Sequence, residues 1–287
     1  ANPSGALNVA ILLIALVSPR ERGSATLRSR FGVQRDQDDL RESMMSIISI
    51  IRQAKRTPPF RGHCPVCGKA TLFIAFGSWL REDLKCVRCK SSARERAVIH
   101  YISGNFAPLS RMSIYEPSPT SRSIEFFDDH AGNYVWSFYP AGRPANDMER
   151  GGSCQDLESL TFDDESFDLV VTQDVFEHVA NPAVAFAEVS RILAPGGSHV
   201  FTIPWYPNQP TQRRAELSDG QTVHLAPPEY HGDPFDSKGA LVFNRFGSDI
   251  ADLVFEASGL TTMITEACDI RKGIRGDSMF IFHSAKE

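Results

Sequence analysis

Four of the six cysteines have the spacing of metal ligands. They form two C-x2-C pairs, Cys64-Pro-Val-Cys67 and Cys86-Val-Arg-Cys89, with eighteen residues between the pairs. Each pair makes a tight turn that directs two sulfurs to one point, and two such turns supply the four thiolates of a closed tetrahedral zinc site. The predicted zinc is structural, because no coordination position is left for water. Disulfides or free buried thiols are the alternatives, but cytosolic disulfides are rare and no secretory signal is present.

The other cysteines and the basic residues near the zinc site give weaker signals. Cys154 and Cys268 stand alone and are predicted to be small buried residues rather than nucleophiles. Arg94 and Arg96 follow the second pair in the run "KSSARERAVIHYI". They could face a phosphate, but their mixture with Glu95 favours a solvated helix face.

Short apolar strands alternate with amphipathic helices from about residue 110 onward, which predicts a mainly parallel sheet covered on both faces. The helix in "NPAVAFAEVSRILAPGG" is predicted to stop at Pro195-Gly196-Gly197. The last two apolar runs, "TTMITEACDI" and "SMFIFHSAK", predict a hairpin that closes the sheet edge. The four predicted parallel strands are Ser113 to Glu116, Tyr134 to Tyr139, Phe167 to Thr172 and His199 to Pro204.

Length and composition suit one substantial domain plus a smaller module. The chain has 287 residues, 42% hydrophobic, and a formal net charge of -5, which gives no overall attraction to a polyanion such as RNA. Residues 1–60 are predicted to be a helical or linker segment. Their apolar run Ala6 to Val17 is too short to span a bilayer and lacks a basic region before it, so a cytoplasmic protein is expected.

The run "LESLTFDDESFDLVVTQDVFEHVANPAVAFAEVSRILAPGGSHVFTIP", Leu157 to Pro204, resembles the middle of class I S-adenosylmethionine-dependent methyltransferases of the type 11 group. Together with the "CPVCG" start of the cysteine module, it is similar to a subgroup that carries an N-terminal zinc ribbon. The resemblance implies a Rossmann-like α/β sheet, a zinc ribbon at 61–105, and a methyltransferase domain at 106–287 with a substrate loop near 205–240. It also implies S-adenosylmethionine as cofactor.

The same resemblance implies which residues contact the cofactor. The first strand-to-helix turn, "IYEPSPTSRSIEFF", contains no glycine, although glycine usually permits positive φ and close approach there. Ser118 is predicted to cap the next helix with Pro119 at its first position, leaving the helix N-terminus for the cofactor's carboxylate. No acid follows the second strand, where Ser137 and Tyr139 stand instead. The cofactor-binding residues implied are Glu116, Pro117, Ser118, Ser137, Asp156, Leu157, Gln173, Asp174 and His178. For Asp156 and Asp174, capping of a helix or turn is the alternative.

Methyl transfer from a sulfonium needs donor and acceptor in line, with a base where the acceptor loses a proton. His178 in "DVFEHV" is a candidate base, or a residue that shapes the pocket. The inserted "HLAPPEYHGDP" loop offers His224, Glu229, Tyr230 and His231 as further catalytic candidates. Its spacing fits no established motif for a second metal.

Three functions remain open from sequence. The first is a methyltransferase for a small-molecule acceptor. The second is an RNA methyltransferase, which would present a basic face made of Arg81, Lys85, Arg88, Lys90, Arg94 and Arg96. The third is a methyltransferase-like protein that binds a partner without catalysis.

Overall fold

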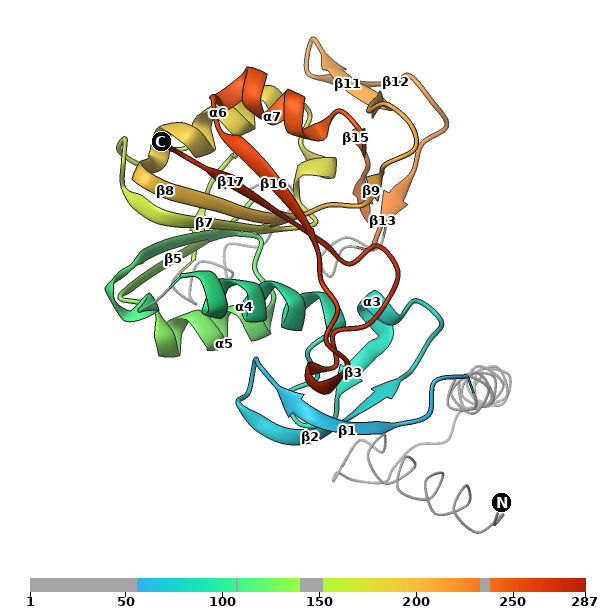
Figure 1. Ribbon diagram of the computed structural model, residues 1–287. Coiled ribbons are helices and arrows are strands. Elements are labelled where there is room, and N and C mark those ends of the chain that lie inside the picture. The colour runs from blue at the N-terminus through green and yellow to red at the C-terminus, as the bar shows by residue number, and fades with distance from the viewer. Residues whose placement is uncertain (1–55, 107, 140–151, 233–237) are drawn as a thin grey trace, which may run out of the picture.

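The computed structural model describes residues 56–106, 108–139, 152–232 and 238–287. Residues 1–55, which hold most of the predicted N-terminal helical segment, lie outside this range. Figure 1 shows a small N-terminal sheet beside a larger α/β sheet. Within the described ranges, no helix combines the length and the apolar character needed to cross a membrane.

The N-terminal module is a three-stranded antiparallel sheet. Its strands are β1 (Phe60–Cys64), β2 (Lys69–Ala75) and β3 (Leu84–Cys86), in that order. A short helix, α3 (Leu80–Asp83), precedes β3, and the longer α4 (Ala93–Asn105) follows it. Helix α4 begins at a capping box, because the Ser92 hydroxyl accepts from the Glu95 N–H and the Glu95 carboxylate accepts from the Ser92 N–H.

The larger sheet has seven strands in the order β16-β17-β8-β7-β4-β5-β6. Strands β4, β5, β6, β7 and β8 are parallel to one another, and β16 and β17 close the edge as an antiparallel hairpin in which β17 pairs antiparallel with β8. The predicted fold class, a Rossmann-like sheet with a terminal antiparallel hairpin, is confirmed. The bounds are β4 (Ser113–Pro117), β5 (Asn133–Phe138), β6 (Ser153–Cys154), β7 (Phe167–Gln173), β8 (Leu193–Thr202), β16 (Thr261–Glu266) and β17 (Phe280–Ala285).

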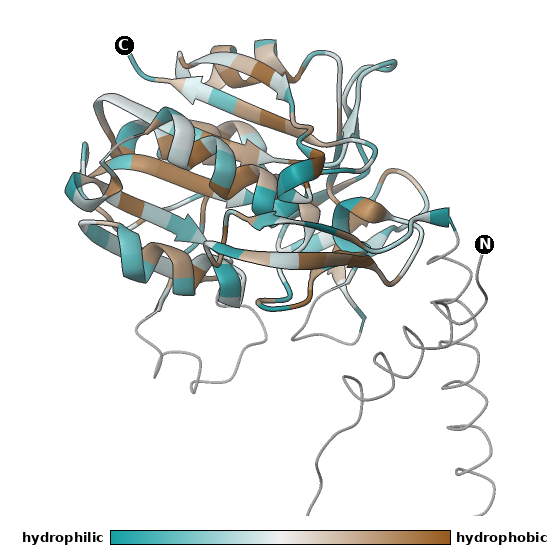
Figure 2. Cartoon of the chain, turned by 60° about the horizontal axis from the view of Figure 1, so that its bottom comes forward, coloured by the Kyte–Doolittle hydropathy of each residue, from teal (hydrophilic) through white to brown (hydrophobic). Residues whose placement is uncertain are grey.

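Helices cover both faces of this sheet (Figure 1). Because successive strand residues point to opposite faces, Leu169 and Val171 of β7 join the core under α4 and α5 (Ser121–His130). Val170 joins the other core, under α6 (Pro182–Ile192) and α7 (Ile250–Ser258). Figure 2 shows the hydrophobic residues gathered along the buried strands, with hydrophilic residues on the outer helix surfaces.

Helix α6 ends earlier than the sequence predicts. It stops at Ile192, and β8 begins at Leu193, so Pro195, Gly196 and Gly197 belong to the first half of the strand. Gly196 has φ +75°, a left-handed conformation that glycine adopts without steric cost. The turn residues therefore shape the start of β8 rather than the end of the helix.

The segment predicted as a substrate loop folds into short paired strands. Strand β11 pairs with β12 as a hairpin, β13 pairs with β14, and β15 joins β9 and β10. Two single-turn 3-10 helices lie outside this segment. They are η3 (Phe176–His178), after β7, and η4 (Ile270–Lys272), before β17. The strand bounds are β9 (Trp205–Tyr206), β10 (Gln212–Arg213), β11 (Ala215–Ser218), β12 (Gln221–His224), β13 (Tyr230–His231), β14 (Ala240–Leu241) and β15 (Asn244–Gly247).

Candidate functional site

The four predicted zinc ligands, Cys64, Cys67, Cys86 and Cys89, lie together at one end of the small sheet. Their sulfur atoms are all within 4.8 Å of one another, and Cys64 Sγ is 3.7 Å from Cys89 Sγ. Two sulfurs bonded to one tetrahedral zinc at about 2.3 Å are about 3.8 Å apart, so the cluster has the size of a zinc site. The side chains present therefore fit a closed, four-thiolate zinc ion.

Arg96 supplies a buried positive charge beside this cluster. Its guanidinium is fully buried and donates to the carbonyl oxygens of Ser91, Leu84 and Gly273. It also lies over the ring of Phe73, 4.6 Å from the centroid. A four-thiolate zinc centre would carry two negative charges, and Arg96 would offset part of them.

The predicted solvated helix face of α4 is wrong. Arg96 is buried, and Arg94 is only 13% exposed and bonded to Glu82. Arg81 is also buried, so three of the six residues expected to form a basic RNA-binding face point into the protein. Cys154 and Cys268, predicted to be buried, are exposed.

In the glycine-free turn after β4, a serine adopts the backbone conformation that usually requires glycine. Ser118 has φ +52°, so it occupies the left-handed region that a glycine usually fills. Its N–H donates to the Ser137 carbonyl at 2.7 Å, which ties the turn to the end of β5. The predicted cap at Ser118 is wrong, because α5 begins at Ser121 and the Thr120 hydroxyl accepts from the Ser123 N–H.

Glu116, at the end of β4, is fully buried with both oxygens engaged. The Tyr134 hydroxyl donates to Oε2 at 2.8 Å, and the Gln173 amide donates to Oε1 at 2.9 Å. Burial raises the pKa of Glu116 to about 7, against the opposing effect of these hydrogen bonds. Pro117, the last residue of β4, is buried as well. Ser137 is buried too, and its hydroxyl is bonded to Tyr115 at 2.7 Å, so it is not offered to a ribose.

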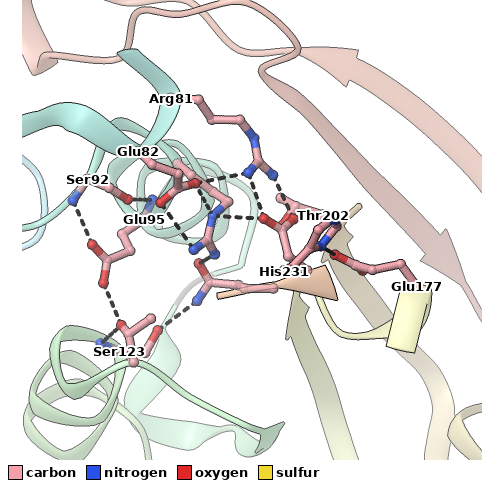
Figure 3. Close-up of polar contacts among 12 residues, drawn as sticks. Arg81, Glu82, Ser92, Glu95, Ser123, Glu177, Thr202 and His231 are labelled. Carbon is pink, nitrogen blue, oxygen red and sulfur yellow. Dashed lines mark hydrogen bonds and ion pairs between the residues drawn. The ribbon is translucent and has the colours of Figure 1, made fainter. Parts of the chain in front are cut away.

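Asp174, directly after β7, is held by two arginines from the N-terminal part of the chain. Arg81 binds both carboxylate oxygens at 2.6 Å, and Arg94 Nε lies 3.2 Å away. The Thr202 hydroxyl donates to Asp174 at 2.9 Å. These cations hold the pKa of Asp174 well below its usual range although the site is buried. Figure 3 shows Arg81 and Glu82 on one side of this network and Thr202 on the other.

Asp156 and Leu157 follow the segment 140–151, which lies outside the described residues. Asp156 Oδ1 accepts from the Glu158 N–H at 2.9 Å, so its carboxylate closes a turn, as the alternative interpretation expected. Leu157 packs into the core under α6 and α7. The cofactor role of either residue stays a prediction.

His178 and His231 come together around a carboxylate that the sequence did not single out. Glu177 is 1% exposed, and its Oε1 lies 3.7 Å from His178 Nε2 and 3.6 Å from His231 Nδ1. The two rings are edge to face, with centroids 5.1 Å apart. Glu177 and His178 belong to η3, whereas His231 arrives on β13, so only the tertiary fold shows that they meet. Figure 3 shows His231 and Glu177 facing one another.

The other catalytic candidates are distributed differently. Glu229 lies next to this group, with Oε1 3.7 Å from His231 Nε2 and Oε2 paired to Arg245 at 2.6 Å. Tyr230 is half exposed. His224 is exposed at the end of the β11–β12 hairpin and does not join the described histidine and carboxylate cluster.

The strand ends offer a partial fit to S-adenosylmethionine. Helix α5 presents its N-terminus beside the Ser118 turn, where first-turn N–H groups lie outside the helix's own hydrogen bonds and favour a carboxylate. Glu116 comes two residues before Ser118, but it is fully buried, and a direct contact requires Tyr134 or Gln173 to give up its bond. Tyr139, the other residue named for the ribose, is 50% exposed.

Comparison with known proteins finds similarity to methyltransferases in the middle of the chain. Residues 143–201 match a family model described as a methyltransferase domain. An uncharacterised protein of transposon TN4556 from Streptomyces fradiae is 43% identical over 61 residues, 21% of this chain and 16% of that protein. Dimethylglycine N-methyltransferase from Parasynechococcus marenigrum is 49% identical over 48 residues, 17% of each chain.

These matches therefore span about a sixth of the length of each curated relative. Among solved structures, an S-adenosylmethionine-dependent methyltransferase from Mesorhizobium loti aligns over 67% of this chain and 98% of its own, with 18% identity and a TM-score of 0.47. Residues 143–201 are thus similar to a methyltransferase domain, and the part of this segment that the structure describes, 152–201, supplies β6, β7 and most of β8 of the parallel sheet.

Proposed function

We propose that this protein is an S-adenosylmethionine-dependent methyltransferase that acts on a small-molecule acceptor. The observation that carries the proposal is the position of the methyltransferase-domain sequence. It supplies β7, α6 and β8, so Gln173 and Asp174 stand at the carboxyl end of a central parallel strand. Ligands of open parallel sheets bind at that edge.

Bound S-adenosylmethionine would supply a methyl group on a sulfonium, which an acceptor lone pair can attack. The chain's own residues would orient the reactants. The N-terminus of α5 binds the carboxylate, and Ser118 holds the turn close enough for that contact. His178 and His231 help to position the acceptor, since both imidazoles lie beside the same buried carboxylate.

A small-molecule acceptor is favoured over RNA by the burial of Arg81, Arg94 and Arg96. The match to a dimethylglycine N-methyltransferase, over 48 residues, supports the same class of acceptor. The four cysteines are assigned to a structural zinc ion, and residues 61–105 to a zinc-ribbon module. We place the protein in the cytoplasm.

Calorimetric titration of S-adenosylmethionine and S-adenosylhomocysteine into the zinc-loaded protein tests the proposal. Asp156→Asn and Glu116→Gln should weaken binding at least about tenfold, the loss of one charge-assisted contact. Asp163→Asn changes an exposed acid of the same domain and should leave affinity unchanged. If the folded protein binds neither ligand, the methyltransferase proposal is wrong and a non-catalytic role as a binding partner is favoured.

A further inference from the structure

The cluster of Glu177, His178 and His231 contains an unsatisfied buried charge. Neither carboxylate oxygen of Glu177 has a hydrogen-bond partner, although the residue is 1% exposed. A buried carboxylate left without partners costs several kcal/mol, so such groups are normally paired or coordinate a metal. Glu177 faces two imidazole nitrogens at 3.6 and 3.7 Å, too far for hydrogen bonds.

The hydrogen bond of the His178 ring shows which of its two nitrogens carries a lone pair. Its Nδ1 lies 2.8 Å from the Leu241 carbonyl oxygen. A carbonyl oxygen can only accept, so Nδ1 carries the hydrogen and the neutral ring has a lone pair on Nε2. That lone pair points toward the oxygen of a carboxylate, which also only accepts. Two acceptors that face one another are satisfied either by a proton on one of them or by a metal ion between them.

The distances between the Glu177 oxygen and the two imidazole nitrogens are close to those between ligands of one shared metal ion. Bonds of about 2.0 to 2.1 Å from one metal to nitrogen and oxygen ligands, at tetrahedral or octahedral angles, place two ligands about 3 to 3.4 Å apart. The observed separations of 3.6 and 3.7 Å exceed this by a few tenths of an ångström. Small rotations of three side chains close that difference.

His178 has the outer partner that a metal-bound histidine usually has, and a carboxylate lies near the outer nitrogen of His231. Such a histidine donates its second N–H to a carbonyl or a carboxylate, which orients the ring. The Leu241 carbonyl does this for His178, and Glu229 Oε1 lies 3.7 Å from Nε2 of His231. Glu229 is itself anchored by Arg245 at 2.6 Å and Arg214 at 3.2 Å.

The backbone holds these ligands in place. The Phe243 N–H donates to the Glu177 carbonyl, and β13 pairs His231 with Ala240. Gly239 has φ +81°, and a Cβ there would lie 2.2 Å from the His231 carbonyl oxygen. The segment therefore approaches His231 so closely that only glycine fits, which fixes the backbone at His231.

We propose that Glu177, His178 and His231 bind one divalent transition-metal ion, separate from the cysteine site. Two imidazoles and one carboxylate suit zinc, iron, cobalt or nickel, and three protein ligands leave positions open for an oxygen or nitrogen atom of a small molecule. His178 and His231 are 21% and 33% exposed, so one side of the ion reaches solvent. This inference does not require the proposed methyl transfer.

Cobalt(II) is the probe for the test. The protein is loaded with zinc and dialysed against a weak chelator, which strips an open three-ligand site but leaves a closed four-thiolate site. Calorimetric titration with cobalt should show one bound equivalent. The visible absorption spectrum should show nitrogen and oxygen ligands and no sulfur charge-transfer band. Glu177→Gln and His231→Ala should weaken this binding at least about a hundredfold, and Glu229→Gln about tenfold.

His224→Ala is the matched control, because it removes an exposed histidine of the same inserted segment. It should bind cobalt like the unmodified protein, and near-UV circular dichroism should show that every variant is folded. The proposal is overturned if the unmodified protein takes up no cobalt beyond the cysteine site. It is equally overturned if folded His231→Ala or Glu177→Gln binds cobalt with unchanged affinity.

Discussion

At the scale of one residue, Ser118 determines the conformation of the glycine-free turn after β4. A non-glycine residue in the left-handed region costs about 1 kcal/mol or more, and the cost is greatest for a β-branched side chain. Ser118→Gly should therefore stabilise the protein by about 0.5 to 1 kcal/mol, and Ser118→Val should destabilise it by about 1 to 2 kcal/mol. Urea unfolding measures both changes.

Thr120→Ala separates this account from the alternative in which Ser118 is the helix cap. It should cost about 1 kcal/mol, because the Thr120 hydroxyl caps α5. A loss of stability in Ser118→Gly with no loss in Thr120→Ala would reverse the assignment.

His199 gives a second prediction at this scale, on pH dependence. It is fully buried in β8, with Nε2 2.9 Å from the Thr172 hydroxyl. Burial, and to a smaller extent His283, lowers its pKa from 6.5 to about 3. Between these values the unfolded chain binds more protons than the folded one, so the free energy of unfolding falls as the pH falls.

Replacement of His199 should remove this contribution. His199→Gln should flatten the pH dependence of the unfolding free energy between pH 5 and 6.5 by up to about 1.4 kcal/mol per pH unit. Urea unfolding at several pH values measures the slope. His224→Gln, an exposed histidine, should keep the original slope, and identical slopes for all three proteins would contradict the prediction.

At the scale of elements, Arg81 of α3 joins the small sheet to the end of β7. Removal of one partner from a buried ion pair leaves an uncompensated charge and costs about 3 to 5 kcal/mol. Arg81→Met should therefore destabilise the protein by this amount, because Asp174 keeps only Arg94 and Thr202. The double variant Arg81→Met/Asp174→Leu should recover part of the loss.

Arg122→Met provides the control for this measurement. Arg122 pairs with Glu125 on the surface of α5, and such pairs contribute less than about 1 kcal/mol. If urea unfolding gave the same small loss for both single variants, the Arg81 contact would not hold the two parts together.

The elements were largely predictable, and the contacts between them were not. The predicted strands match β4, β5 and β7 closely, because each is an apolar run between turn signals. Sequence reasoning missed Arg81 and Arg94, since arginines in mixed-charge runs are usually solvated and Asp174 lies 93 residues from Arg81. Glu177 was missed for the same reason, because only the fold brings His231 to it.

At the scale of the whole molecule, the cysteine cluster should determine stability. Cys86→Ser should abolish zinc binding in the ribbon and lower the unfolding temperature by about 10 °C or more, because binding energy of a structural zinc is folding energy. Metal analysis after weak chelation, with differential scanning calorimetry, measures both effects. Cys154→Ser, an exposed cysteine outside the cluster, should change neither. Unchanged zinc content in Cys86→Ser would exclude a four-cysteine site.

The contact between Arg81 and Asp174 would couple zinc binding in the ribbon to cofactor binding at the sheet. If zinc orders the ribbon, and the ribbon fixes the strand end where the cofactor is proposed to bind, then zinc raises cofactor affinity by some factor. Thermodynamic reciprocity requires the cofactor to raise zinc affinity by the same factor. Such a protein would bind zinc and cofactor most tightly when both are abundant. At a low concentration of either one, its apparent affinity for the other would fall.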